Sequence, residues 1–403
     1  MSTHELSGAV AIRLAINGQE VDLSVNRIDS VIVRNHVLYQ VPTMEFRIDS
    51  MSDLVQTAGL VDGVQIDCSI GPTSDSKKFQ SRRYRVYKVR PQPSGMKYSY
   101  DVSCYYDKPE YFLKKQTLSN QGTSSDTIQQ MIQSEGITAD IDATQDHQVW
   151  RNTGLSKSAY IRKVMLSRMY SDDQSAYLYG YSSISDRIRI KNIAQILNNL
   201  EVVQFVNNFA LASAGTPAAL FHEYSAHMAS GQSNAKTGGY GLNGYTFDLT
   251  QGASATNSGA SVIVPTGDLN INGSLAGHAT RFIYDSVDVG NTHDNYYKAK
   301  VQNARIISTY SNYLELLVPM NSGCDLLDPV SVKALTKINT STVDTTISGK
   351  YICVGVDMLA TYTQYVEKVY LARNNIDVQN FGNLLTAGLT NTIEQLVAEV
   401  FQL

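Results

Sequence analysis

The sequence predicts an α+β fold that is mainly β, with two similar small antiparallel β-barrels, an inserted two-helix α+β module and a Gly/Ser-rich insert. Short stretches of alternating apolar and polar residues fill the first hundred residues and return near the end of the chain. Helical periodicity is concentrated in the middle. Two hairpin patterns, one in each β region, have the same spacing. These three observations indicate two β units around a mixed module.

Length and composition bound the architecture. At 403 residues the chain is too long for one small core, so we expect two to four folding units. Only 17% of the residues are charged, and Ser, Thr, Asn, Gln and 25 Tyr take their place. Such a surface suits a chain that partners cover, because Tyr offers rigid contact area with one polar tip. The same composition is also typical of any β-rich protein.

Net charge and cysteine usage narrow the class of protein. A net charge of −4 argues against a nucleic-acid binder held by phosphate contacts. Four scattered cysteines without a CxxC pair indicate buried thiols in a protein assembled in a reducing cytoplasm. The N-terminus does not resemble a signal peptide, and no apolar stretch has the length of a membrane span. We therefore expect no stable membrane insertion.

Residues 1–110 are predicted to form the first β-barrel, because only strand signals occur from Leu6 to Tyr106. Val10–Ile16 alternates, and Asn17-Gly18 is a typical two-residue hairpin turn. Several short antiparallel strands in about a hundred residues are typical of a small barrel or sandwich. The further expected strands are Val21–Val25, Ile28–Val33, Met44–Ile48, Val64–Ile70, Tyr84–Val89 and Tyr98–Cys104.

Residues 111–199 are predicted to form the α+β module. Thr123 can cap a helix that Gly136 ends, with Asp126 in its first turn. A second helix is expected over Ser158–Tyr170. Its cap would be Ser156 or Ser158, and two short strands follow, Ala176–Tyr181 and Ile188–Ile190.

The second β-barrel is assigned to residues 200–225 and 291–376. It includes expected strands over Glu201–Phe209, Tyr313–Val318 and Pro329–Val332 and a helix over His293–Ser308. Residues 226–290 form an insert rich in Gly, Ser and Asn. Two alternatives remain open for this insert: a disordered segment, or an extended loop region that partners support.

The two hairpin patterns are Tyr84–Asp107 and Tyr351–Asn374. In the second, the apolar residues at 352, 354, 356 and 358 are expected on one face of a strand, which a break at Ala360-Thr361 ends. A shift of 267 residues superposes Tyr84 on Tyr351, Val89 on Val356, Tyr98 on Tyr365 and Val102 on Val369. Either an internal duplication or the chance alignment of two hairpins explains these matches.

Residues 377–403 are interpreted as a linker and a C-terminal amphipathic helix. Thr390 or Asn391 can start the helix, with Glu394 in its first turn. The apolar stripe is the candidate interface and consists of Leu389, Ile393, Leu396, Val397, Val400 and Phe401. A helix of about four turns is marginal alone, so it is expected to fold against its own barrel or against a partner.

The sequence gives only weak signals for a metal site or a catalytic site. His222 and His227 are five residues apart, whereas zinc-protease helices space their histidines by four, so no metal site is expected. Carboxylate pairs for glycoside cleavage, Asp172-Asp173 or Asp140 with Asp142, lack an accompanying aromatic cleft motif. The Tyr clusters (Tyr105, Tyr106 and Tyr111; Tyr177, Tyr179 and Tyr181) are either a sugar-binding platform or core and interface filling. We expect no catalytic residue and no cofactor.

Three passages carry a resemblance to a known family. They are YRVYKVRPQPSGMKYSYDVSCYYD leading into SSDTIQQMIQSEG, then LSKSAYIRKVMLSRM followed by SAYLYGY, and finally SGKYICVGVDMLATYTQYVEKVYLARN. The chain is similar in these passages to the bacteriophage tail baseplate hub family of contractile tails, which is related to the hub part of type VI secretion VgrG spike proteins. A histidine frequent in the family's last hairpin is replaced here by Met358 or Leu359.

The resemblance implies a non-enzymatic structural protein of the virion, located in the tail baseplate and assembled in the cytoplasm of the host bacterium. It implies a homotrimer in which two barrels per chain form a pseudo-sixfold ring between the sixfold tail tube and the threefold central spike. The implied partners are the chain itself, the spike, the tail tube or tube-initiator protein and other baseplate proteins. DNA would pass through the channel without specific binding. The alternative is a β-rich carbohydrate-binding or cell-wall-hydrolysing tail component.

Overall fold

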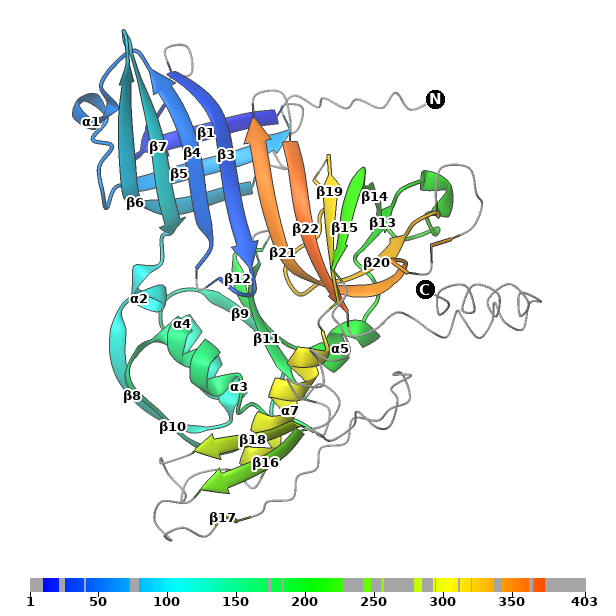
Figure 1. Ribbon diagram of the computed structural model, residues 1–403. Helices are drawn as coiled ribbons and strands as arrows, with labels where there is room; N and C mark the ends of the chain where they lie inside the picture. Colours follow the sequence, from blue (N-terminus) through cyan, green and yellow to red (C-terminus); the bar gives the residue numbers. More distant parts are fainter. Residues whose placement is uncertain are drawn as a thin grey trace, which may run out of the picture.

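Among the residues that the structure describes, fourteen strands pair into one sheet that runs through both β regions of the sequence. The computed structural model describes residues 10–21, 26–39, 41–72, 80–172, 175–182, 185–227, 242–247, 255–256, 279–284, 293, 295–310, 312–319, 321–336, 343–344, 346–361 and 365–373. Figure 1 shows the two β units side by side, with the module beneath them. The predicted class, α+β and mainly β, is confirmed.

In its described residues the first β unit has seven strands and a short helix, α1 (Leu54–Thr57). Its β1 begins and ends where the sequence predicts, and Asn17 and Gly18 both have positive φ (52° and 79°), as the hairpin turn requires. β2 then ends at Glu20, and residues 22–25 of the next expected strand lie outside the described residues. The strands are β1 (Val10–Ile16), β2 (Gln19–Glu20), β3 (Asn26–His36), β4 (Thr43–Ser50), β5 (Gln65–Pro72), β6 (Gln80–Ser94) and β7 (Lys97–Tyr106).

The core of this unit comes from the alternation of its strands. Met44, Phe46 and Ile48 on β4 are buried and lie opposite Cys104, Val102 and Tyr100 on β7. β1 and β5 cross behind these strands in Figure 1, which places their buried residues against the same interior.

The described part of the second β unit also has seven strands. They are β13 (Val203–Val206), β14 (Ala218–Leu220), β15 (Glu223–His227), β19 (Asn312–Val318), β20 (Pro329–Lys333), β21 (Gly349–Thr361) and β22 (Tyr365–Arg373). A turn of 3-10 helix (Phe209–Leu211) occupies the end of the strand that was expected to reach Phe209. β21 is buried on both faces from Tyr351 to Val356, and a bulge lies between Cys353 and Gly355, so the expected simple alternation is wrong there.

The predicted break at Ala360-Thr361 is also wrong. β21 continues through both residues because they pair with Val31 and Ser30 on β3 of the first unit. The partner strand is more than 300 residues away in the sequence, which is why local propensity did not indicate the continuation.

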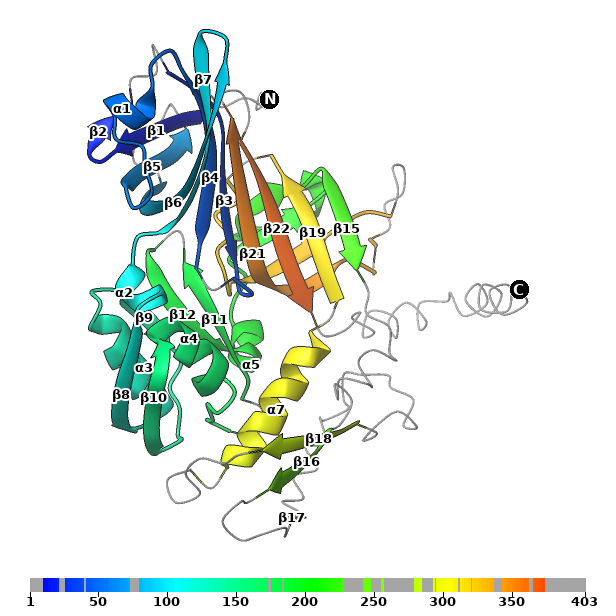
Figure 2. The ribbon, with the colours of Figure 1, turned by 60° about the vertical axis from the view of Figure 1, so that its left-hand side comes forward.

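The described residues of the module form two small sheets and four helices, which can be followed in Figure 2. Thr123 caps α3 by accepting a hydrogen bond from the Asp126 N–H, as predicted. Ser156 is the cap of α4, which continues as a π-helical turn (Ile161–Met165) and is shorter than expected. The elements are α2 (Pro109–Phe112), β8 (Lys115–Gly122), α3 (Ser124–Gln133), β9 (Thr138–Ile141), β10 (Gln148–Ser156), α4 (Lys157–Tyr160), β11 (Tyr177–Ser182), β12 (Arg187–Asn192) and α5 (Ile193–Asn198).

The helix expected over His293–Ser308 is α7 (Tyr296–Thr309), and it contacts the module. The Asn303 side chain accepts a hydrogen bond from the Tyr177 N–H (3.1 Å), and Figure 2 shows α7 beneath the second unit. Beyond it lie β16 (Leu242–Phe247), β17 (Ala255–Thr256) and β18 (Ala279–Tyr284), which form a separate three-stranded sheet. Among the described helices none is long and apolar enough to cross a membrane.

Candidate assembly interface

The two hairpins have the same register. Val89 lies opposite Val102 in the β6/β7 hairpin, and Val356 lies opposite Val369 in the β21/β22 hairpin, 267 residues later at both positions. The pairing register of each hairpin also shifts by one residue at a bulge, which lies at Tyr87 in the first hairpin and at Val354 in the second. A shared bulge is a stronger match than shared residue types, because a bulge displaces the register of every pair beyond it.

The strands beside the hairpins correspond as well. β5 places Ile66 opposite Tyr84, and β20 places Val330 opposite Tyr351. On the other side, β4 and β19 flank the equivalent strands β7 and β22, and β3 and β15 follow in turn. The units therefore have the same order over five strands. They differ at the sixth, because β1 is antiparallel to β5 whereas β13 is parallel to β20.

The hairpin residues predicted to mark the two barrels lie mainly in the core. Five are buried, namely Tyr84, Val102, Tyr351, Val356 and Val369. The other three, Val89, Tyr98 and Tyr365, are partly buried. These side chains therefore fill the interior of the two units.

Side chains at equivalent positions in the two hairpins form hydrogen bonds to equivalent loops, which follow β4 in the first unit and β19 in the second. Tyr100 accepts a hydrogen bond from the Leu54 N–H and donates one to Asp53 (2.9 Å), which fixes the loop between β4 and β5. At the matching position, Glu367 accepts hydrogen bonds from the N–H and hydroxyl of Ser322 in the loop between β19 and β20. Burial raises the pKa of Glu367, although the hydrogen bonds from Ser322 act in the opposite direction.

The two units join where β3 pairs with β21, and we call this contact the inter-unit junction. It runs from His36 opposite Gly355 to Ser30 opposite Thr361. A Cβ on residue 355 would lie 2.2 Å from His36 Cδ2 and 2.9 Å from Tyr370 Cδ2. Only glycine therefore allows the close approach of the His36 ring, which packs edge-on against Tyr370 with ring centres 5.5 Å apart.

Besides Arg34, which lies opposite Asp357 and forms an ion pair with Glu45, two titratable groups lie in the inter-unit junction. Burial lowers the pKa of His36, whose Nδ1 accepts a hydrogen bond from the Leu38 N–H (3.0 Å). Burial raises the pKa of Asp357, while the Tyr370 hydroxyl, which donates to it at 3.0 Å, acts in the opposite direction. Both shifts favour the neutral form of a group that the junction encloses.

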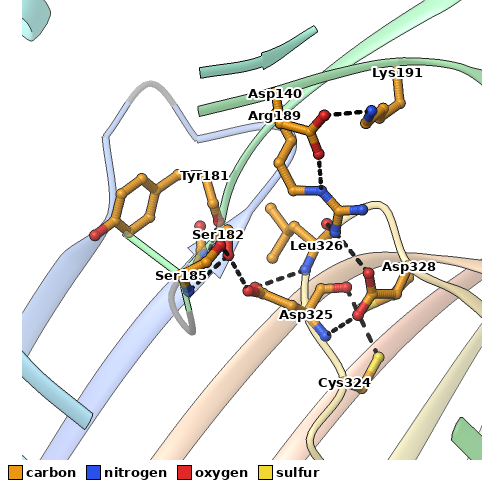
Figure 3. A network of polar contacts seen from close by, with 12 residues as sticks. Asp140, Tyr181, Ser182, Ser185, Arg189, Lys191, Cys324, Asp325, Leu326 and Asp328 are labelled. Atoms are coloured by element: carbon orange, nitrogen blue, oxygen red, sulfur yellow. Dashed lines mark hydrogen bonds and ion pairs between the residues drawn. The ribbon is translucent and has the colours of Figure 1, made fainter. Parts of the chain in front are cut away.

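A buried polar network fixes the module to the second unit (Figure 3). The Arg189 guanidinium donates to the Leu326 carbonyl and to Asp328, both at 2.6 Å. Asp328 in turn accepts from the Asp325 N–H, and the Ser182 hydroxyl donates to Asp325 (2.5 Å). Burial raises the pKa of Asp328, and Arg189 opposes that shift.

The module also contacts the first unit. Asn35 on β3 donates to the Tyr181 carbonyl on β11 (2.7 Å). Arg162 donates to the Val37 and Leu38 carbonyls, both at 2.9 Å. Because β3 is also half of the inter-unit junction, the module supports the junction from below.

The structure brings Asp140 and Asp142 together but does not join the candidate catalytic and metal residues in one site. Asp140 and Asp142 both accept hydrogen bonds from Lys191 (2.6 and 2.9 Å) in a polar pocket of about 460 Å³ between module and second unit. His227 lies on the exposed strand β15, five positions along an extended chain from His222, so the two rings face opposite sides. Among the described residues no group of His, Cys, Asp or Glu could hold a metal ion.

Five of the six Tyr residues in the two clusters fill the core: Tyr106, Tyr111, Tyr177, Tyr179 and Tyr181 are buried. Tyr105 is only partly buried, and its ring lies near that of the exposed Tyr87, with centres 6.2 Å apart. The hydroxyls of Tyr106 and Tyr181 both donate to Asp186 (2.5 and 2.6 Å), and their rings pack with centres 4.7 Å apart. These side chains are therefore not available as an exposed sugar-binding platform. The six residues of the tail interface, together with Asp173, lie outside the described residues.

Sequence reasoning missed the residues that make the junctions. A glycine within a strand pattern indicates a close backbone approach, and Gly355 carried that signal. His36, Arg189 and Asp328 carried none, because their partners are remote in the sequence.

Comparison with known proteins gives a match at the level of structure. Neither a protein-family model nor a curated protein sequence matches the chain. A 43 kDa tail protein of prophage MuSo2 from Shewanella oneidensis has a TM-score of 0.58 at 10% identity, over 91% of this chain and 99% of its own. A tail protein from Neisseria meningitidis MC58 has a TM-score of 0.55 at 9% identity, over 92% and 98%.

A prophage tail protein from Listeria monocytogenes EGD-e has a TM-score of 0.50 at 12% identity, over 94% of this chain and 99% of its own. Identities this low establish a shared fold and nothing finer. The resemblance to phage tail proteins that the sequence motifs indicated is thus confirmed in three dimensions: this chain has the fold of these tail proteins.

Proposed function

We propose that this chain is a baseplate hub protein of a phage tail. Three copies would form a ring in which two β units per chain give six similar surfaces around one axis. Such a ring can meet a sixfold tail tube on one side and a threefold central spike on the other. The role is structural and requires no catalytic step.

The observation that carries this proposal is the repeated unit with its shared register and bulge. A protein that joins sixfold and threefold structures needs six similar surfaces on the side of the sixfold partner. On the side of the threefold partner, the two units of each chain must differ from each other. Two units with one strand order but different sixth strands meet that requirement. The fold of phage tail proteins supports the same role.

The experiment that tests the proposal is a measurement of solution mass with imaging of the oligomer. Light scattering is expected to give about three times the 44.4 kDa chain mass. Electron microscopy is expected to give a threefold ring with a central hole. A stable monomer at high micromolar concentration, with and without the tube and spike proteins, would contradict the proposal.

A further inference from the structure

Eight strands run in one antiparallel series across both units. Their order is β6, β7, β4, β3, β21, β22, β19 and β15, which Figure 1 shows from left to right. The series ends at two open edges: the outer edge of β6 from Lys88 to Ser94, and the outer edge of β15. In the described part of the chain no strand pairs with either edge.

The repeat makes these two edges equivalent to the two sides of the inter-unit junction. β6 corresponds to β21, because the hairpins match in register. β15 corresponds to β3, because each pairs with the strand beside that hairpin. The junction within the chain is therefore a template for a contact between chains, in which β15 of one copy lies against β6 of the next.

The template fixes the register of this contact. Met358 lies opposite Val33 in the inter-unit junction. The equivalent positions are Pro91 on β6 and Ala226 on β15. Gln92 then lies opposite Ser225, and Arg90 opposite His227. Arg90 would also lie near Glu315, whose carboxylate is 3.9 Å from the His227 ring and 2.6 Å from the Lys368 ammonium, so Arg90 and Lys368 would share this carboxylate.

Two prolines make the β6 edge different from the β21 edge. The Val37 N–H donates to the Val354 carbonyl across the inter-unit junction (2.9 Å). Alternate residues direct their backbone groups to the same edge, so Met358 and Ala360 also direct theirs toward β3. Their counterparts on β6 are Pro91 and Pro93. Proline has no N–H, so this edge can accept hydrogen bonds at both positions but cannot donate them.

Strand β15 offers the donors that this edge lacks. All five of its residues are exposed, and by the same alternation Tyr224 and Ala226 direct their N–H groups outward. Ser225 directs its N–H inward to β19. Two β6 edges cannot complete a ladder with each other, because neither donates at the proline positions.

We infer that β15 of one copy adds to the β6 edge of a second copy of this chain, with Ala226 opposite Pro91. The N–H groups of Ala226 and Tyr224 donate to the carbonyls of Pro91 and Pro93. This inference rests on the proposed trimeric hub and identifies the contact that closes it. Because the contact joins two different edges, it is a head-to-tail interface, which forms a ring when the rotation closes.

Disulfide trapping tests the register. The double variant Gln92→Cys/Ser225→Cys places the thiols opposite each other, and both native side chains are exposed. The four native cysteines are buried, so background oxidation is low. Mild oxidation is expected to give covalent dimers and trimers on a non-reducing gel. The matched control Gln92→Cys/Tyr224→Cys is displaced by one residue onto the opposite face and is expected to give at least tenfold less cross-linked product.

The outcomes separate this inference from the proposed function. A trimer by light scattering in which Gln92→Cys/Ser225→Cys does not cross-link, or cross-links no better than the control, overturns the strand contact and leaves the hub intact. A monomer that never cross-links overturns both. A trimer with selective cross-linking supports both.

Proline substitution tests the direction of the hydrogen bonds. Ala226→Pro removes an outward N–H and is expected to weaken trimer association about tenfold while the melting transition is unchanged. Ser225→Pro removes an inward N–H and is expected to lower the melting temperature. Unchanged association in Ala226→Pro, or an equal loss of melting temperature in both variants, would overturn the inferred orientation of β15.

Discussion

Gly355 and His36 determine how closely the two β units approach. The His36 ring occupies the space that a side chain at residue 355 would need, and it packs against Tyr370 at the same time. The contact lies beside the bulge at Val354, where β21 stops following a simple alternation. One small residue thus allows one aromatic ring to enter the junction.

Replacing Gly355 with Ala is expected to lower the free energy of unfolding by about 1–3 kcal/mol, because the new methyl group overlaps His36 and Tyr370. Urea unfolding monitored by circular dichroism measures this loss. His36→Ala frees part of the space, so the same substitution is expected to cost less in a His36→Ala background. Equal costs in the two backgrounds would show that the ring does not set the spacing.

The neutral form of His36 is expected to make stability depend on pH. Its folded pKa lies below the ordinary value of 6.5, so its contribution is present above that pH and is lost as the pH falls below it. Protonation of Nδ1 removes the hydrogen bond from the Leu38 N–H, at a cost of about 1 kcal/mol. The free energy of unfolding, measured from about pH 7.5 to about pH 5.5, is expected to fall accordingly.

His36→Asn is the matched control for this pH dependence. The Asn carboxamide oxygen can accept the same N–H two residues later and does not titrate. The variant is therefore expected to lose the part of the pH dependence that occurs just below pH 6.5. An unchanged pH profile in His36→Asn would assign that dependence to other groups.

At the scale of elements, ion pairs and carbonyl contacts position the module. Arg189 on β12 reaches the loop before β20, where it binds Asp328 and the Leu326 carbonyl. The Arg189 and Asp328 side chains are only 13% and 11% exposed. A buried pair of this kind adds little net stability over apolar residues, but removal of one partner leaves a charge buried.

Arg189→Met is expected to destabilise the chain by about 3–5 kcal/mol, because Asp328 then stays buried without its cation. Thermal and urea unfolding measure the loss. The double variant Arg189→Met/Asp328→Leu removes both charges and is expected to recover much of it. A double variant that is less stable than Arg189→Met would contradict this account.

Elements with strong local patterns could be predicted, and those that depend on remote partners could not. β1, the Asn17-Gly18 turn and the Thr123 cap of α3 follow from short-range chemistry. β8 and β10 were missed because β8 is a polar strand with no buried residue, held by its pairing with β10. The continuation of β21 through Thr361 depends on β3 and therefore has no local signal.

At the scale of the whole molecule, the repeat was visible in sequence as four matched residues, but its junctions were not. Tyr84 and Val102 match Tyr351 and Val369 because they fill equivalent core positions. The residues that join the units differ between the two copies. Lys88 stands at the position of Gly355, and Pro91 at that of Met358. Residue types differ between the two repeats where their surfaces meet different neighbours. A search for repeats in the sequence therefore detects the core positions and misses the residues that join the units.

The C-terminal stripe from Leu389 to Phe401 gives the last prediction. Its six apolar residues recur at helical spacing, and they follow the last strand of the second unit after a connector. Six such side chains at about 1.5–3 kcal/mol each are ample to hold a contact even after ordering costs. We propose that this stripe docks on a neighbouring copy or on the spike and not on its own unit.

A chain that stops after Asn380 tests this proposal. If the stripe is an interface element, the shortened chain is expected to keep its melting temperature and to lose ring assembly or spike binding by light scattering. The matched control replaces Leu396 and Val400 with Ser in the full-length chain, which removes apolar contact without removing the segment. The described residues of β19, β21 and β22 pair with one another without this segment. Removing the segment therefore breaks no strand pairing among these three strands. A collapse of the melting transition in both variants would instead assign the stripe to the chain's own core.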